Sequence, residues 1–421
     1  MHVLFLTSNH PSFHRGTAVN VVLASLIEAM GHLGHRVSWA TVCTEDARDP
    51  ETEQRLEGVG ARYFADFSDM VETFNLTPPW STLNILRRGL FPRVNDDYPQ
   101  FRDPRGAARR LMDSGADAVI LFWDTWFEHL LPAIDGIPTV VYGARPRHAA
   151  PLSRLEEGEG GTGMRAGLRR WIATRLLSHQ AARRYERLKH ASRVVNISPV
   201  DVTECESNGV HCEYLPNTWP DDVGKEWAQK RKVAEARDRT INILGNMSGV
   251  TQSGNLFGMR YLASQILPLL NEVLKNVEWE LNITGGGQLP PDLENFFDHP
   301  CVKVKGYVPD IEEEILGNHI FLLCNNAGPL PGSYTRVIYA MSLGACLIGH
   351  KNLEAAMPEV KSNYNTLLGE NARAIAKLIE NAIRDPELRN RISSNARITY
   401  EQYFRPEIVA RRLTDLIERA F

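Results

Sequence analysis

The stretch GSYTRVIYAMSLGACLIG, residues 332–349, decides the fold of this chain. An apolar run, His319 to Cys324, precedes it and predicts a buried strand, and Asn325 to Gly332 predict a turn-rich loop. The stretch itself predicts a short amphipathic helix that ends at Gly344, followed by another short apolar strand. This order of elements is typical of a parallel sheet with helices on its faces.

The start of this helix has the chemistry of an anion-binding site. A helix N-terminus offers unpaired backbone N–H groups and the positive end of the helix dipole. Ser333 is predicted to cap the helix, and Arg336 lies in its first turn with a guanidinium suited to phosphate. The same pattern also fits an ordinary strand–helix–strand unit without a ligand, so the local sequence leaves both interpretations open.

Strands alternate with helices along most of the 421 residues, which predicts an α/β protein with two doubly wound domains. We expect a first domain at 1–220 and a second at 221–404, joined near Pro216 to Gly224, with a helix at about 405–421 packing back on the first. Strands are predicted at 2–7, 34–42, 116–122, 138–142, 193–197, 240–244, 279–283, 302–304, 320–324 and 346–348. Helices are predicted at 17–33, 255–274, 372–384, 386–402 and 406–420. Two such domains facing each other would form a deep cleft at the carboxyl ends of their strands.

Composition narrows the classes of function. A formal net charge of -4 gives no indication of a nucleic-acid partner. The six cysteines lack a C-x-x-C pair and metal-ligand spacing, so we interpret them as reduced thiols of a cytoplasmic protein and expect no metal site. No apolar run reaches the roughly 20 residues that a membrane helix needs, and Walker A, H-E-x-x-H and G-x-S-x-G motifs are missing.

The chain resembles the retaining glycosyltransferases of GT-B fold, the family-4-like group, over most of its second half and parts of its first. Residues 332–349 resemble the donor-phosphate helix of that family, whose pattern runs roughly G-G-T-R-L-K-I-L-E-A-M-A-x-G-x-P-V-V. Arg336 stands at the position of the family's phosphate-binding lysine. Further similar segments are Ser198 to Asp201, Leu215 to Asn217, Leu244 to Met247, Gly254-Asn255, 266–270 and Gly306 to Asp310.

Both glutamates of the family's E-x7-E pair are missing from this sequence. Tyr339 occupies the position of the second glutamate, which normally holds the donor ribose, and Pro331 that of the first. The Tyr339 ring would either stack on a ribose or fill the space. Three hypotheses stay open: a glycosyltransferase using a nucleoside-diphosphate sugar, a non-catalytic relative that binds a nucleotide or glycan, and a relative using an atypical donor or a cyclitol.

The resemblance implies a hexosyltransferase-type transfer with retention and without metal or other cofactor, in which the leaving phosphate takes the acceptor's proton. The first domain would bind a carbohydrate, lipid-linked or small-molecule acceptor, and the second the nucleotide sugar. The catalytic candidates are Arg336 and His148. The donor-binding candidates are Gly16, Thr17, Gly245, Asn246, Gly286, Tyr307, Val308, Gly332, Ser333, Tyr334, Thr335 and Tyr339, and the acceptor-binding candidates are His14, Arg15, Asp124 and Arg145.

Several of these candidates have a second interpretation. Gly16 and Thr17 follow the first strand and open a helix, but they also fit a plain surface loop. The glycines of Thr284 to Gly287 would serve either a ligand or close packing, and Tyr307-Val308 either a nucleobase or a turn. His148, like the alternative His129, would also fit a surface or capping role.

Two segments between these motifs carry predictions of their own. Residues 66–105 hold five prolines and predict an irregular insertion, and Glu156 to Gly163 predict a surface loop. The segment 164–190 contains eight Lys or Arg, one Glu and an apolar helical stripe. It predicts either a helix that lies on the inner face of an acidic membrane or a docked helix with a solvated basic face.

Overall fold

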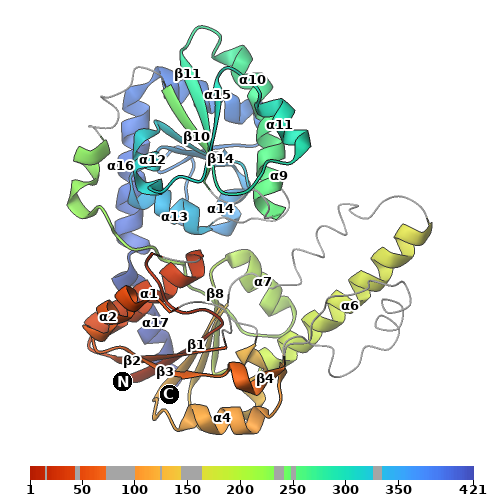
Figure 1. Cartoon of the computed structure of the whole chain (residues 1–421), viewed down its shortest axis with the longest axis vertical. Coiled ribbons are helices and arrows are strands. Elements are labelled where there is room, and N and C mark those ends of the chain that lie inside the picture. Colours follow the sequence, from red (N-terminus) through yellow and green to blue (C-terminus); the bar gives the residue numbers. More distant parts are fainter. Residues whose placement is uncertain are drawn as a thin grey trace. The chain divides into compact units, whose positions relative to one another are not determined.

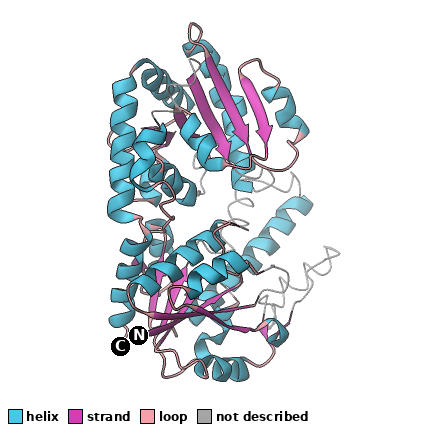
Figure 2. Cartoon of the chain, turned by 60° about the vertical axis from the view of Figure 1, so that its left-hand side comes forward, coloured by secondary structure: helices cyan, strands magenta, loops and turns pink. Residues whose placement is uncertain are grey.

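The computed structural model describes residues 1–14, 17–42, 48–72, 100–123, 126–143, 164–231, 241–247, 253–325 and 334–421. The chain forms two compact units, one of Met1–Pro216 with Pro406–Phe421 and one of Asn217–Arg405. Each unit has a parallel sheet with helices around it (Figures 1 and 2). The predicted α/β class with two doubly wound domains is therefore confirmed.

The first unit contains a seven-stranded sheet in the order β3-β2-β1-β6-β7-β8-β9. These strands are β1 His2–Thr7, β2 Arg36–Thr41, β3 Arg62–Asp66, β6 Ala118–Phe122, β7 Thr139–Gly143, β8 Arg193–Asn196 and β9 Glu213–Tyr214. Its helices are α1 Ala18–His32, α2 Pro50–Glu57, α4 Pro104–Met112, α6 Met164–Leu188, α7 Pro199–Ser207 and α17 Pro406–Glu418. Leu4 and Leu6 of β1 pack into a core shared with α4 and a 3₁₀ segment at Phe127–Ala133.

The second unit contains a six-stranded sheet in the order β12-β11-β10-β13-β14-β15. The strands are β10 Ile241–Met247, β11 Trp279–Thr284, β12 Val302–Gly306, β13 Ile320–Leu323, β14 Leu347–His350 and β15 Leu367–Gly369. The helices are α9 Ser253–Tyr261, α10 Leu267–Val273, α11 Pro291–Phe297, α12 Ile311–Gly317, α13 Tyr334–Ser342, α14 Asn352–Ala356, α15 Ala372–Arg384 and α16 Pro386–Tyr403. In both units the strand order reverses beside the first strand, which is where doubly wound sheets bind ligands.

Two local expectations need correction. The predicted helix 255–274 is interrupted by a π-helical segment, Leu262–Ile266, immediately before Pro268, which has no N–H to continue the helical ladder. The insertion 66–105 is not wholly irregular, because Ser68–Met70 form a 3₁₀ turn and β4 Val71–Glu72 pairs with β5 Gln100–Phe101. Residues 73–99 and the predicted loop 156–163 lie outside the described residues.

Candidate functional site

Helix α13, which carries Arg336, is held in place at its carboxyl end. Gly344 adopts a φ of 59°, and the N–H groups of Gly344 and Ala345 bond the carbonyls of Met341 and Ala340. This is the Schellman pattern that ends a helix on a left-handed glycine. A Cβ at Gly344 would lie 2.4 Å from the Trp227 ring, so the packing as well as the backbone needs glycine here. The predicted stop at Gly344 is confirmed.

At the amino end of α13, Arg336 joins two asparagines from other elements. The Arg336 guanidinium and the Asn325 amide both donate to the side-chain oxygen of Asn255, the latter at 2.6 Å. Asn255 lies in the first turn of α9, and Asn325 follows the carboxyl end of β13. The cluster therefore brings the N-terminal turns of two nine-residue helices to the end of a central strand.

A glycine in α9 allows this close approach. A Cβ on Gly258 would lie 2.8 Å from the side-chain oxygen of Asn325 and 2.9 Å from its backbone nitrogen. These distances are shorter than real side chains tolerate, so α9 can pack this tightly against the end of β13 only with glycine. Sequence reasoning did not select Asn255, Asn325 or Gly258 as site residues.

The electrostatics of Arg336 favour an anionic ligand. Burial lowers the pKa of Arg336 to about 10, so the guanidinium is charged at neutral pH but poorly solvated. A phosphate group beside it would replace lost hydration with charge-assisted hydrogen bonds. Ser333 and Gly332 lie outside the described residues, as does the side chain of Tyr334, while Thr335 is half-buried in the first turn.

Tyr339 fills space inside the second unit. Its ring stacks on that of Trp219 with 4.9 Å between ring centroids, and only 7% of the residue is exposed. Burial raises the pKa of Tyr339, so the phenol stays neutral. The sequence leaves two roles open for the Tyr339 ring, stacking on a donor ribose or filling space. The observed packing matches the second role, and a contact with a ribose stays a prediction.

The other donor candidates of this unit lie near the carboxyl ends of their strands. Gly245 is buried at a bulge in β10, where a Cβ would meet Leu281, Ile283 and Leu262, so core packing accounts for this glycine. Gly286 and Tyr307 are exposed after β11 and β12, and Val308 is half-buried beside Tyr307. The side chain of Asn246 lies outside the described residues.

In the first unit, the loop after β1 is organised by two buried side chains. Asn20 accepts from the Thr17 backbone N–H at 2.8 Å and donates to the His10 carbonyl at 2.7 Å, which caps α1. Asp49 accepts from the Ser12 hydroxyl at 2.5 Å; although burial opposes it, this bond and those from Thr52 lower the pKa of Asp49.

The remaining candidates of the first unit are only partly described. The exposed imidazole of His14 lies 3.7 Å from the Glu51 carboxylate. Arg15, Gly16, Asp124, Arg145 and His148 lie outside the described residues. Their predicted roles stay predictions.

Trp123 is an unusual residue at the carboxyl end of β6. It is not glycine, yet its φ is 50°, and its ring stacks on Phe122 with 5.1 Å between centroids. Backbone strain of this kind clusters at functional sites. Nearby, burial lowers the pKa of His129 to about 3, and Arg187 and Arg183 act in the same direction. His129 is therefore neutral at physiological pH.

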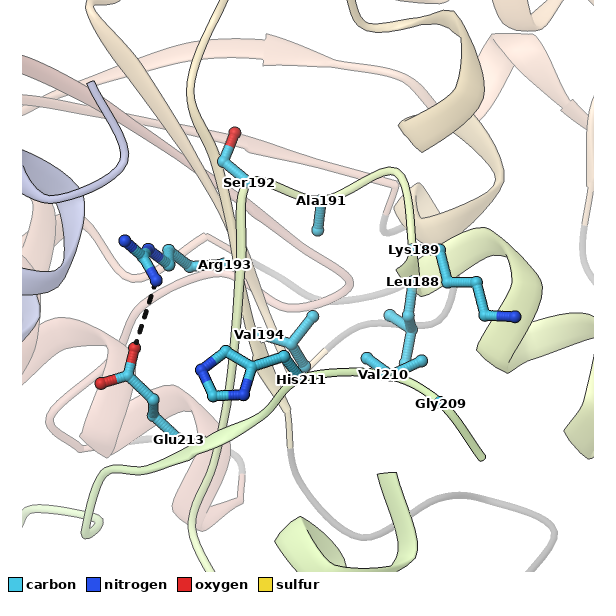
Figure 3. A pocket seen from close by; sticks show the side chains of 10 residues that line it. All are labelled: Leu188, Lys189, Ala191, Ser192, Arg193, Val194, Gly209, Val210, His211 and Glu213. Carbon is cyan, nitrogen blue, oxygen red and sulfur yellow. Dashed lines mark ion pairs between the residues drawn. The ribbon is translucent and has the colours of Figure 1, made fainter. Parts of the chain in front are cut away.

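One cavity of the first unit, about 190 Å³ in volume, opens at the amino ends of the strands, whereas Trp123 lies at the carboxyl ends (Figure 3). It lies where β8 begins, between the segments Leu188 to Val194 and Gly209 to Glu213. Its charged groups compensate one another: Arg193 and Glu213 approach to 3.9 Å, and Arg419 pairs with the same carboxylate at 3.1 Å. This arrangement gives it no clear preference for a charged ligand.

The predicted basic helix is α6, which begins away from the sheet and ends against it (Figure 1). Near its end, the buried Arg184 binds both oxygens of the Glu128 carboxylate at 3.0 Å through Nε. Nearer its start, Trp171 is 50% exposed and lies under the Arg175 guanidinium. One end of α6 is thus docked and the other is accessible. In the described parts of the chain, we find no helix with the length and apolar character of a membrane span.

Several solved structures share this architecture. The chain aligns over 100% of its length with 99% of a sucrose-phosphate synthase from Thermosynechococcus elongatus, at 14% identity and a TM-score of 0.65. It likewise aligns over 100% with 98% of a glycosyltransferase from Rickettsia africae at 13% identity and a TM-score of 0.61. HepE of Anabaena, solved with UDP and glucose, aligns over 100% of both chains at 13% identity and a TM-score of 0.59. At these identities the likeness shows the fold, which is the GT-B fold of glycosyltransferases.

A match to a protein family in the second unit agrees with this fold. Residues 239–385 match the family described as glycosyl transferases group 1, and this segment contains the Arg336 cluster. The resemblance of this segment to group 1 glycosyltransferases, which the sequence predicts, is therefore confirmed. No protein with a curated description matches the sequence.

Proposed function

We propose that the chain transfers a sugar from a nucleoside-diphosphate sugar to an acceptor hydroxyl, with retention of configuration and without a metal ion. The observation that carries the proposal is the cluster of Arg336, Asn255 and Asn325 at two helix N-termini. Two helix dipoles and a poorly solvated guanidinium favour a diphosphate at this position. Anabaena HepE, one of the similar structures, was solved in complex with such a ligand, the nucleoside diphosphate UDP.

The proposed step needs little more from the protein than charge stabilisation. The bond between the anomeric carbon and the phosphate oxygen breaks, and the acceptor oxygen bonds to the same carbon. The acceptor proton passes to the departing diphosphate, so no protein base is required. Arg336 would stabilise the negative charge that develops on the leaving group. The acceptor would bind in the first unit, where the strained Trp123 precedes the acceptor-binding candidate Asp124 in the sequence.

A second candidate function is a non-catalytic relative that binds a nucleotide or glycan. The packing of Tyr339 on Trp219 favours it, since this ring stands where the family has the glutamate that holds the donor ribose. An atypical donor would fit the same observation. Binding measurements separate these functions better than sequence does.

We expect one nucleoside diphosphate to raise the melting temperature of the purified protein, with or without EDTA. The test screens UDP, GDP, dTDP, ADP and CMP by thermal shift. A ligand at a hundred times its Kd adds about 2.7 kcal/mol to the stability of the native state, which is readily measured. A shift that EDTA abolishes would contradict metal independence. The absence of any shift would favour an atypical donor or a non-catalytic relative that binds a glycan.

We also propose peripheral membrane contact through residues 164–190, supported by the accessible start of α6. The protein is expected to sediment with vesicles that contain phosphatidylglycerol but not with pure phosphatidylcholine vesicles. Trp171→Ala and Arg175→Ala should each weaken binding to the anionic vesicles. The tryptophan would lose its apolar contact with the membrane, and an arginine near an anionic surface contributes about 1 kcal/mol. Arg373→Ala, an exposed arginine of α15, serves as the control. Equal binding to both vesicles, or equal loss in the control, would contradict the proposal.

A further inference from the structure

The second unit has a cavity of about 430 Å³ away from the Arg336 cluster. It lies between the loop that leads into β15 and the last turns of α16, so it is at the amino ends of the strands. The donor candidates lie at the carboxyl ends, which makes this a separate site. Its volume falls within the roughly 300–1,000 Å³ of small-molecule sites. The side chains that carry the argument are Glu359, Lys361, Tyr364, Thr399, Gln402 and Tyr403.

Two tyrosines at this cavity are unusually accessible. Tyr364 is 47% exposed and Tyr403 is 43% exposed. Tyrosine is usually more buried, and exposed aromatic rings that gather at one place mark binding sites. A tyrosine ring offers a flat apolar face for packing and a hydroxyl for hydrogen bonding.

The loop that presents Tyr364 is rigidly built. The fully buried Asn365 donates to the Glu359 carbonyl and to the Thr399 hydroxyl, both at 2.8 Å, and accepts from the Lys361 N–H at 2.8 Å. Asn395 of α16 donates to the Tyr364 carbonyl at 2.9 Å. The fold thus fixes the backbone that presents this exposed ring, and such preorganisation lowers the entropic cost of binding.

The polar groups of the cavity identify the class of ligand. An acid, Glu359, a base, Lys361, and an amide, Gln402, line it together. The mixed charges disfavour a phosphate or another strong anion, while donors and acceptors together suit a ligand rich in uncharged hydroxyl groups. Tyrosine rings pack well against the C–H faces of a pyranose ring.

We infer that this cavity binds a neutral saccharide, as an anchoring site apart from the sugar-transfer site. The choice of a saccharide rests in part on the proposed glycosyl transfer, since an acceptor or product glycan would be close at hand. A saccharide held by Tyr364 and Tyr403 would keep a glycan on the enzyme between encounters with the transfer site.

Isothermal titration of the full chain with maltotriose, cellotriose and chitotriose tests the inference. At least one trisaccharide should bind, and Tyr364→Ala and Tyr403→Ala should each weaken that binding about tenfold. Phe296→Ala is the matched control, because Phe296 of α11 is also 47% exposed in the same unit but does not line the cavity. A melting temperature without ligand close to that of the unsubstituted protein, in all three variants, would show that the fold is intact.

Failure of this inference can be told apart from failure of the proposed function. If no trisaccharide binds, or if Tyr364→Ala binds as the control does, the saccharide site is wrong. Binding that is lost in Arg336→Ala but kept in Tyr364→Ala would place the saccharide at the donor site and also overturn the inference. Trisaccharide binding that depends on Tyr364, in a protein that no nucleoside diphosphate stabilises, would support the inference and count against the proposed donor.

Discussion

Replacing Arg336 with alanine should lower kcat/KM for sugar transfer by about a hundred- to a thousandfold. This is the usual loss when one preorganised donor to a developing negative charge is removed. The variant should also lose the thermal shift given by the nucleoside diphosphate, because the same guanidinium would hold the diphosphate before reaction. The measurements are steady-state release of nucleoside diphosphate and melting with and without the ligand.

Two further variants sharpen this experiment. Arg336→Lys keeps a positive charge but loses the planar fork that binds two oxygens and reaches Asn255, so only part of the activity should return. Arg260→Ala is the control, since Arg260 lies in the last turn of α9, the helix that carries Asn255, but is exposed and pairs with Asp292 at 2.9 Å. Wild-type turnover in Arg336→Ala would show that the donor diphosphate binds elsewhere.

The core of the fold was predictable because its central strands are buried on both faces. Such strands read as continuous apolar runs, as in β1 and β13, and their bounds agree with the sequence to within a residue. Helix α15 was also predictable at both ends, since Asn371 caps it and Asp385-Pro386 end it. Edge strands gave less information: β15 has three residues, and β12 exposes Lys303, Val304 and Lys305.

The site was predictable only as far as its position on the sheet. The sequence located the helix that carries Arg336, but Asn255 and Asn325 carry no charge, and the similar segment Gly254-Asn255 does not by itself mark Asn255 as a partner of Arg336. Asn255 lies 70 residues from Asn325 and 81 from Arg336, so their meeting follows from the order of strands in the sheet. The environment of Tyr339 was hidden for the same reason, since its neighbour Trp219 lies far away in the chain.

Replacing Arg397 with alanine should lower the free energy of unfolding by about 3–5 kcal/mol. Arg397 of α16 is only 1% exposed, and its guanidinium donates to both carboxylate oxygens of Asp221 at 2.7 and 2.8 Å. It also donates to the carbonyls of Gly224 and of Ser342, the last residue of α13. Removing Arg397 takes two donors from the partly buried Asp221 carboxylate and one from each of these two carbonyls, which is the costly way to break a buried ion pair.

Arg405→Ala is the matched control, because Arg405 binds the same Asp221 carboxylate at 2.8 Å from a side chain that is 39% exposed. Its loss should cost less than about 1 kcal/mol. Urea denaturation measures both variants, and equal losses would contradict a special role for the buried arginine.

The pH dependence of stability gives an independent check. Although burial opposes it, hydrogen bonds from Arg397 and Arg405 lower the pKa of Asp221 in the folded protein. The stabilisation is therefore complete above the unfolded pKa of about 4 and is lost as the pH falls through the lower folded value. Asp221→Asn should be less stable at neutral pH and should show a smaller further loss in acid, since the group that titrates has been removed.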